Sequence, residues 1–288
     1  MSWNIYHLIY IPKGPVHIGY HKLGFIQRTR YYILARNIWG AIASNLTKAI
    51  YEDPDTQKYS DIGKEINEHV LISYFYPTFN RNGKNPFIPE YSNTGIRYGE
   101  LSENRFESIF VRSHTQTAIE PSSVTAEEGS LHETEFILPI VKYRGEIEPI
   151  YFVGYIIINN NWEKIDKCLD IMDEICVGGE RRYGFGRLRL IGLPELQKER
   201  SIFNYPLKED GSGPLLIIPK GKPIPAHLVA DPCLELKGDI EPLVGWDYEK
   251  GEYKLRLYHE GKIFWLPGSI PEKELALKID KFGILTKV

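Results

Sequence analysis

Gly178-Gly179-Glu180-Arg181-Arg182-Tyr183-Gly184-Phe185-Gly186-Arg187 is the stretch of sequence that decides the fold. It follows a segment with helical spacing and leads into a short apolar strand expected over 187–191. Gly179 and Gly184 have the spacing of a P-loop, but Phe185-Gly186 stands where that loop requires Lys followed by Ser or Thr. A dinucleotide-binding fingerprint is also excluded, because such a loop opens a helix and not a strand.

The residue types of this loop favour an anionic ligand. Glycine has no Cβ atom, so the backbone of a ligand can approach it closely. Arginine donates several hydrogen bonds from a permanent positive charge, which suits phosphate groups. A purely structural interpretation stays open beside this one, in which the glycines form a helix cap followed by a hairpin turn.

The first 51 residues have an unusual charge. They contain neither Asp nor Glu, and their cations are Lys13, Lys22, Arg28, Arg30, Arg36 and Lys48. Since the whole chain has a net charge of −3, this segment of +6 leaves −9 for the rest. Aromatic residues such as Tyr20 and Phe25 lie between the cations. Cations bind phosphates and rings stack on unpaired bases, so the segment predicts binding of single-stranded RNA. The alternative is a solvated basic face.

Composition bounds the class of protein. With 288 residues, 42% of them hydrophobic and 25% charged, the chain is globular, in one large domain or two ordinary ones. The three cysteines form no C-x-x-C pair, which argues against a disulfide framework or a thiolate metal site. The longest apolar stretch, around 150–158, is too short to cross a bilayer as a helix. We therefore expect a soluble, cytoplasmic protein.

Hydrophobic spacing predicts an α+β fold. Apolar residues recur at helical spacing over 35–51 and again from 160 to 175, whereas 108–112 and 149–158 have the composition of strands. The segment 114–132 is polar and is expected to be an extended excursion. The order of strands and helices indicates a ferredoxin-like unit, with an antiparallel sheet and its helices on one face.

Three motifs together resemble the RAMP superfamily, the ferredoxin-like RNA-binding subunits of CRISPR systems. The first is the glycine-rich loop, with the pattern G-G-x-R-R-x-G-F-G-R before an apolar strand. The second is Pro15-Val16-His17-Ile18-Gly19 followed by Arg28-Thr29-Arg30-Tyr31-Tyr32-Ile33, although Leu34-Ala35 replaces the Pro-Gly often found there. The third runs from Thr115 to Glu135, the segment from which the family projects a β-hairpin thumb. The resemblance covers about residues 5–190.

The resemblance implies two ferredoxin-like (RRM-like) domains. The first would span 1–200, with the thumb at about 114–135 and the glycine-rich loop at 178–187. A smaller ferredoxin-like domain would span 201–288. About 100 residues follow the glycine-rich loop, and Phe264–Ile270 is similar to the second domain of the type III effector subunits that cap the 5′ end of the guide RNA.

The implied function is that of a non-catalytic subunit in a type III CRISPR antiviral effector complex. Its partners would be single-stranded guide RNA, whose 5′ tag it would hold, and neighbouring subunits, including the large cyclase-type subunit. Two alternatives stay open: an endoribonuclease that processes guides or cleaves target RNA, and a backbone subunit that binds the body of the guide. Backbone subunits cut with an early Asp, and residues 1–51 contain none.

The site follows from these motifs. The residues expected to bind RNA are His17, Lys22, Arg28, Arg30, Arg36, Gly178, Gly179, Arg181, Arg182, Gly184, Gly186 and Arg187. We expect no catalytic residue, and His17 and His21 are the alternatives, because a metal-free ribonuclease needs a general base and a general acid. No metal site and no cofactor are expected. Glu127, Glu128, Glu133 and Glu135 are interpreted as solvated charges of the thumb.

Overall fold

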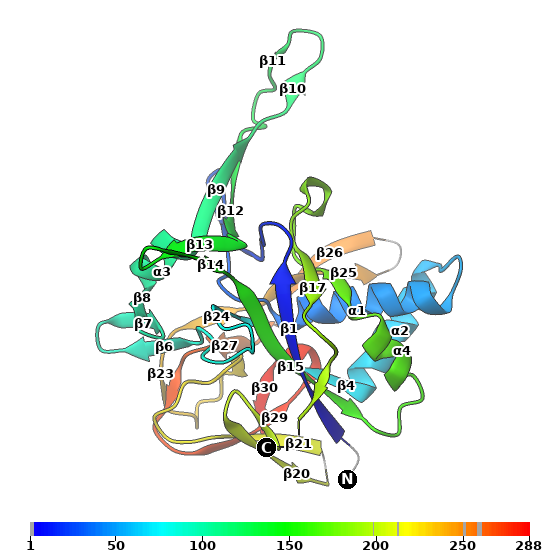
Figure 1. Cartoon of the computed structure of the whole chain (residues 1–288), viewed down its shortest axis with the longest axis vertical. Coiled ribbons are helices and arrows are strands. Elements are labelled where there is room, and N and C mark those ends of the chain that lie inside the picture. The colour runs from blue at the N-terminus through cyan, green and yellow to red at the C-terminus, as the bar shows by residue number, and fades with distance from the viewer. Residues whose placement is uncertain (1–2, 198, 212, 250–251, 258–260) are drawn as a thin grey trace.

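A seven-stranded antiparallel sheet forms the centre of the molecule (Figure 1). The computed structural model describes residues 3–197, 199–211, 213–249, 252–257 and 261–288. The path of the sheet is β16-β17-β1-β15-β4, with β18 paired to β1 and β5 paired to β15. Its strands are β1 (Trp3–Pro12), β4 (Val70–Ile72), β5 (Tyr76–Thr78), β15 (Tyr151–Asn159), β16 (Glu174–Cys176), β17 (Arg187–Leu190) and β18 (Glu195–Leu196).

The central pair of strands is buried on both faces. β1 and β15 pair from Trp3–Asn159 to Tyr10–Phe152. Seven of the nine residues of β15 are buried. A strand covered on both sides has a continuous apolar sequence without alternation, as Tyr151–Ile158 does. The apolar stretch around 150–158, which is too short to cross a membrane as a helix, is therefore the central strand β15.

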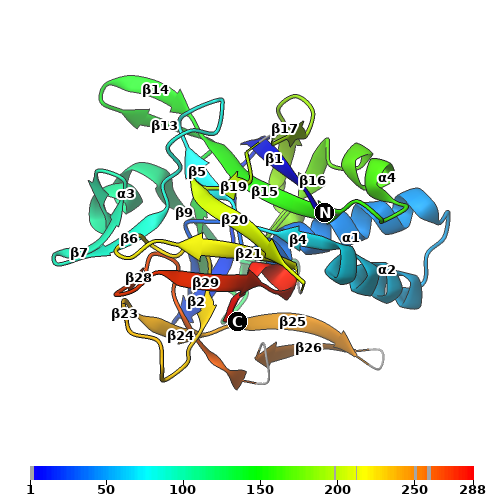
Figure 2. The same cartoon turned by 90° about the horizontal axis from the view of Figure 1, so that it is seen from below.

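Four α-helices accompany the described strands. They are α1 (Ala35–Ile50), α2 (Thr56–His69), α3 (Glu103–Phe110) and α4 (Ile165–Asp170). α1 confirms the helix expected over 35–51, and α2 packs along it, with Trp39 Nε1 donating to the carbonyl oxygen of Gly63 at 3.1 Å. Figure 2 shows α1, α2 and α4 together at one side of the molecule.

Two local predictions were wrong. Most of the segment expected as a strand over 108–112 belongs to the end of α3, because Phe106, Ile109 and Phe110 share one buried helical face. The helix expected from 160 to 175 is reduced to the six residues of α4, and Ile175 lies in β16. Trp162, although spaced as a helix residue, is buried before α4 begins and donates to Glu65. Short apolar patterns of this kind fit helix and strand equally well.

The polar excursion is a long hairpin, as expected (Figure 1). β9 (Val111–Gln116) pairs with β12 (His132–Ile137), and two short strands, β10 (Ile119–Glu120) and β11 (Thr125–Ala126), pair near the tip. At its base β12 also pairs with β3 (Ile26–Thr29), which pairs with β2 (Gly19–Leu23). We call residues 111–137 the thumb. It contains neither Lys nor Arg apart from Arg112.

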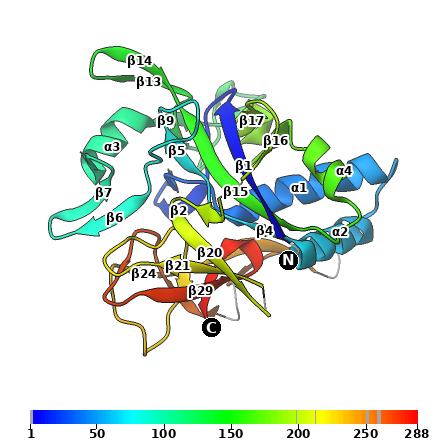
Figure 3. The ribbon, with the colours of Figure 1, turned by 60° about the horizontal axis from the view of Figure 1, so that its bottom comes forward.

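Two smaller sheets lie beside the base of the thumb. The first is a three-stranded sheet of β6 (Pro89–Ser92), β7 (Gly95–Tyr98) and β8 (Leu101–Ser102). The second is a hairpin of β13 (Ile140–Tyr143) and β14 (Glu146–Pro149). Figure 3 shows both near α3 on this side of the molecule.

The C-terminal part is a sheet without α-helices in its described residues. Its path is β19-β20-β21-β29-β30-β22-β27-β24. The strands are β19 (Ser201–Ile202), β20 (Tyr205–Asp210), β21 (Gly213–Ile218), β22 (Leu228–Val229), β24 (Ile240–Pro242), β27 (Ile263–Trp265), β29 (Leu275–Ile279) and β30 (Leu285–Lys287). Two further pairs are β23 (Leu236–Lys237) with β28 (Ile270–Pro271) and β25 (Val244–Glu249) with β26 (Glu252–Leu257).

The described residues of 201–288 therefore do not form a second sheet covered by helices on one face. The described residues there include the 3₁₀ turn Lys281–Gly283 but no α-helix. The physical reason is visible in the sequence, where strand-length apolar stretches alternate with Gly and Pro turns and none has the length of an amphipathic helix. Figures 2 and 3 show β20 and β21 (yellow) beside β15.

One hydrophobic core joins both parts of the chain. Residues of the first 200, such as Leu8 and Ile38, belong to the same buried cluster as Leu216 and Leu277. No helix among the described residues is long and apolar enough to cross a membrane.

Candidate nucleic-acid interface

The glycine-rich loop is attached by its backbone to the turn that follows β1. The amide of Gly179 donates to the carbonyl oxygen of His17 at 3.0 Å, and the amide of Gly186 donates to that of Pro15 at 2.8 Å. Within the loop, the amide of Val177 donates to Gly186 at 2.9 Å. Two of the three motifs that resemble the RAMP superfamily are thus brought into contact.

The glycines of this loop have different roles. A Cβ atom on Gly178 would lie 2.0 Å from the carbonyl oxygen of His17, and one on Gly186 would lie 1.8 Å from that of Val177. At these two positions the protein's own backbone fills the space that the missing Cβ atom leaves. This corrects the expectation that the absent side chains leave room for RNA. Gly184 differs, because a Cβ atom there would meet nothing within 4 Å, although its φ of +83° favours glycine.

The charged side chains of the loop point outward. Arg181, Arg182 and Tyr183 form a 3₁₀ turn and are exposed, Tyr183 to 67%. Arg181 donates from Nε to the carbonyl oxygen of Gly178 at 3.0 Å, and Arg187 pairs with Glu174 at 2.6 Å. Arg182 has no carboxylate partner in the described part of the chain. The turn therefore presents two cations and one ring to solvent.

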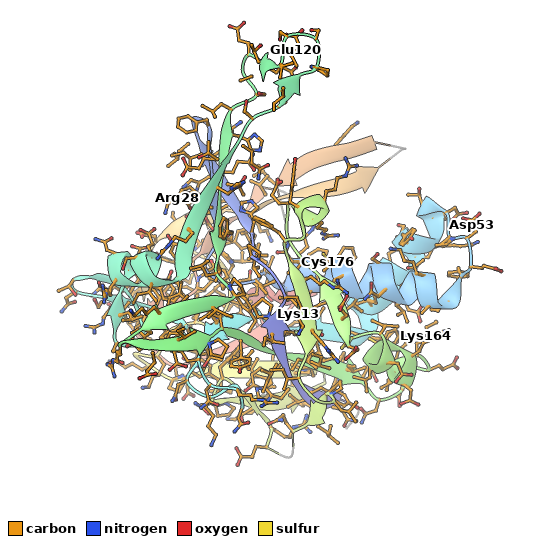
Figure 4. The ribbon with its side chains drawn as sticks, turned by 45° about the horizontal axis from the view of Figure 1, so that its top comes forward. Lys13, Arg28, Asp53, Glu120, Lys164 and Cys176 are labelled. Atoms are coloured by element: carbon orange, nitrogen blue, oxygen red, sulfur yellow. The ribbon has the colours of Figure 1, made fainter. Side chains whose placement is uncertain are left out.

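Arg28 lies at the base of the thumb, where it joins three elements (Figure 4). Its Nε donates to Glu135 of β12 at 2.8 Å, and its Nη2 donates to Glu107 of α3 at 2.6 Å and to the hydroxyl of Tyr31 at 3.0 Å. Tyr31 also donates to Glu107. The side chain of Arg28 is 30% exposed, so most of its hydrogen-bonding capacity serves the protein itself.

Arg30 is buried and connects the N-terminal segment to the C-terminal sheet. Its Nη1 pairs with Glu241 of β24 at 2.6 Å, and its guanidinium lies 4.3 Å from the centre of the Tyr20 ring. Glu241 also accepts a hydrogen bond from Nε2 of His227 at 2.7 Å, while Nδ1 of His227 lies 2.7 Å from the hydroxyl of Tyr74. With 8% of Arg30 exposed, it is a structural group and not a surface cation.

The pKa values of this buried network show how its charges are divided. Burial lowers the pKa of His227 to about 4, against the hydrogen bond to Glu241, which raises it. Although burial raises the pKa of Glu241, the hydrogen bond from His227 and the charge of Arg30 lower it to about 2. At neutral pH the network is therefore a neutral imidazole, one carboxylate and one guanidinium. The hydroxyl of Tyr74 then donates to Nδ1, and Nε2 donates to the carboxylate.

We expect the free energy of unfolding to fall as the pH drops from about 6.5 to about 4. In this window the unfolded chain protonates His227 and the folded chain does not, so stability is lost as protons are added. The loss from this one group is on the order of 2–3 kcal/mol. Urea titrations at pH 7 and pH 4.5 measure it, and His227→Gln should reduce the difference. An equal difference in the variant would show that other groups cause it.

The remaining predicted cations and histidines are dispersed. Lys22 is exposed on β2, whereas the guanidinium of Arg36 lies 4.9 Å from the centre of the Phe282 ring. His17 is only 5% exposed, and its Nδ1 lies 2.7 Å from the carbonyl oxygen of Glu135. His21 is exposed, with its ring 3.8 Å from that of Tyr20. The two histidines therefore do not form a facing acid–base pair: one is a packed anchor and the other is on the surface.

No group of three or more His, Cys, Asp or Glu side chains in the described residues is placed to hold a metal ion. Glu135 is bound to Arg28, while Glu127 and Glu128 are exposed on the thumb. Figure 4 shows Glu120 at the end of the thumb, far from Arg28. The acids that pair with Arg28 and Arg30 come from positions 107, 135 and 241, and no local pattern in the sequence marks them as partners of these arginines.

Comparison with known proteins shows what this fold is similar to. No protein-family model and no curated protein matches the chain. Among solved structures, it is similar to a chain of the cryo-EM structure of the type III-B Cmr-beta bound to cognate target RNA, with 12% identity, a TM-score of 0.54 and coverage of 92% of this chain and 86% of that one. For the Cmr-beta bound to cognate target RNA and AMPPnP, the values are 13%, 0.56, 93% and 86%. The chain thus shares its fold with subunits found in type III-B Cmr-beta structures.

Proposed function

We propose that this chain is a guide-RNA-binding RAMP subunit of a type III CRISPR effector complex, acting in the cytoplasm. In this proposal it holds the 5′ tag of the guide, docks onto neighbouring subunits, the large cyclase-type subunit among them, and catalyses no reaction. The observation that carries it is the exposed turn Arg181–Tyr183, held by backbone hydrogen bonds against the turn after β1. Exposed cations beside a ring suit a single-stranded RNA, whose phosphates and bases need both.

The topology supports assignment of the N-terminal part, 1–200, as a ferredoxin-like domain. β1 is followed by the β2–β3 hairpin, α1 and α2, then β4, and β15 is followed by α4, the edge strand β16 and then β17. The strand order β17-β1-β15-β4, antiparallel throughout, fits a β-α-β-β-α-β unit. The thumb is an insertion into this unit. We treat 201–288 as a second, all-β module that shares its core with the first.

The RNA-binding residues that we retain are accessible and pair with no carboxylate in the described part of the chain, whereas the exposed Arg187 pairs with Glu174. They are Lys22, Arg181 and Arg182, with Tyr183 as a stacking partner and Gly179 and Gly184 as backbone positions. Arg28 and Arg30 hold the thumb and the C-terminal sheet to the N-terminal segment. Gly178, Gly186 and His17 shape the loop from within. Of the cations in the acid-free segment 1–51, we therefore retain only Lys22 as an RNA-binding residue.

Arg181→Ala with Arg182→Ala should weaken binding of a tagged guide RNA about tenfold or more, since each lost charge-assisted bond to phosphate costs about 1–3 kcal/mol. The salt dependence of binding should also become shallower by about 0.7 per lost phosphate contact. Fluorescence anisotropy at several salt concentrations measures both. Lys142→Ala with Arg144→Ala, in the β13–β14 hairpin, removes the same charge elsewhere and serves as the control. Equal losses in both double variants would contradict a specific role for the loop.

The isolated chain and the assembled complex distinguish the proposed function from the two alternatives, an endoribonuclease and a backbone subunit. The proposal predicts that the isolated chain leaves a repeat RNA intact with Mg²⁺ and with a chelator, whereas an endoribonuclease would cut it and lose activity on His21→Ala. Photo-crosslinking with a 4-thiouridine in the 5′ tag or in the guide body, on the assembled complex, separates a tag-binding subunit from a backbone subunit. A crosslink to 181–183 from the guide body alone would contradict the tag assignment.

A further inference from the structure

A pocket of about 430 Å³ lies between β2–β3, α3 and the three-stranded sheet β6–β8. Its walls are rich in aromatic rings, contributed by Tyr20, Tyr31, Tyr32, Tyr91 and Tyr98. Leu266 and Pro267, directly after β27, complete it. A volume of this size suits a small group or one side chain and not a segment of a double helix.

The two arginines in the wall of the pocket are already paired with carboxylates. Arg28 is paired with Glu107 and Glu135, and Arg30 is paired with Glu241. Two more acids stand around it: Glu103 in the wall, and Asp239, which accepts a hydrogen bond from Tyr91 at 3.0 Å. The carboxylates that line the pocket are Glu103 and Glu107, beside Arg28 and Arg30, and of the two only Glu107 is paired with an arginine in the described part of the chain. A carboxylate without a counter-ion in the wall disfavours a phosphate and favours a cation.

Two polar groups in the wall have no partner within the described part of the chain. The carboxylate of Glu103, on the first turn of α3, makes no hydrogen bond and no ion pair. Burial raises the pKa of this carboxyl, and the neighbouring charge of Glu107 raises it further, as for an acid that lacks its counter-ion. Tyr98 is 4% exposed, lines the pocket and makes no hydrogen bond through its hydroxyl. Both groups can accept a hydrogen bond from an occupant.

We propose that this pocket binds the guanidinium of an arginine side chain presented by a protein partner. A guanidinium is planar, so it stacks on tyrosine rings, and its several N–H groups can satisfy Glu103 and Tyr98 together. It also supplies the positive charge that the carboxylate of Glu103 lacks. This site is separate from the RNA-binding turn at 181–183, and it gives the chain a protein-docking function beyond RNA binding.

The test uses the full chain and small probes. N-acetyl-arginine amide should bind at millimolar concentrations in NMR titrations, about tenfold more tightly than its neutral isostere N-acetyl-citrulline amide. Glu103→Gln should weaken binding of the arginine probe by about tenfold, and Tyr98→Phe should weaken it by roughly threefold. Glu146→Gln, an exposed acid of β14, removes the same charge elsewhere and should leave binding unchanged. Thermal melts confirm that each variant is folded.

Three results would overturn the proposal: equal binding of the citrulline and arginine probes, absence of binding by either, or displacement of the arginine probe by guanosine 5′-monophosphate. The last result would make this a nucleotide pocket. The RNA affinity of Glu103→Gln, measured in parallel, separates this inference from the proposed function. Wild-type RNA binding with no arginine binding refutes only the pocket, whereas arginine binding by a chain that binds no RNA refutes only the proposed function.

Discussion

Glu241→Gln should lower the free energy of unfolding by about 3–5 kcal/mol, because it leaves the charge of Arg30 buried without its counter-ion. Arg30 is 8% exposed and its Nη1 lies 2.6 Å from the carboxylate of Glu241. The same substitution replaces the acceptor that His227 uses, since Nε2 lies 2.7 Å from that carboxylate. A buried cation that loses its partner pays the full desolvation penalty, which an amide dipole offsets only in part.

Urea unfolding monitored by tryptophan fluorescence measures this change. Glu100→Gln is the matched control, because Glu100 also pairs with an arginine, Arg144, but with 63% of its side chain exposed. Exposed pairs contribute at most about 1 kcal/mol, so the control should change stability little. The double variant Arg30→Met with Glu241→Leu should recover much of the loss, since it removes both charges. If the double variant is as unstable as Glu241→Gln, packing and not the unpaired charge is the cause.

Gly186→Ala should cost about 3–4 kcal/mol of stability, the second large effect. The residue has a φ of +74°, and a Cβ atom would lie 1.8 Å from the carbonyl oxygen of Val177. The backbone must move, and this breaks the hydrogen bonds that join Gly186 to Val177 and to Pro15. Strain of about 1–2 kcal/mol for a left-handed residue adds to about 1 kcal/mol for each bond.

Gly184→Ala, two residues earlier, isolates the strain from the collision. Gly184 has a φ of +83°, and a Cβ atom there meets nothing within 4 Å. It should therefore cost only about 1–2 kcal/mol. Differential scanning calorimetry of the two variants compares them directly, and equal melting temperatures would contradict the backbone collision at Gly186. Loss of RNA affinity in folded Gly184→Ala would in addition indicate that RNA approaches this open position.

The sequence determined those features in which neighbouring residues decide the structure. The helical spacing of Ile38, Ile42 and Leu46 predicted α1 within one residue of its C-terminal end. The apolar sequence of 149–158 predicted a strand, which is β15, and the polar composition of 114–132 predicted an extended excursion, which lies within the thumb. The Gly-Arg pattern predicted an exposed cationic loop at 178–187, and its exposed turn is Arg181–Tyr183. Each leaves a pattern of apolar, polar, glycine or charged residues within a few positions along the chain, and such a local pattern can be read from the sequence.

Only the tertiary structure decided which cations are available to a ligand. The segment 1–51 has six cations and no acid, yet Arg28 and Arg30 find carboxylates 79, 107 and 211 residues away along the chain. Likewise, a side chain at Gly178 or Gly186 would collide with a carbonyl oxygen of the protein itself. For Gly178 that oxygen belongs to His17, on the turn after β1. Charge and glycine content are properties of composition, whereas pairing and collision depend on distances of a few ångströms between segments that only the folded sheet brings together.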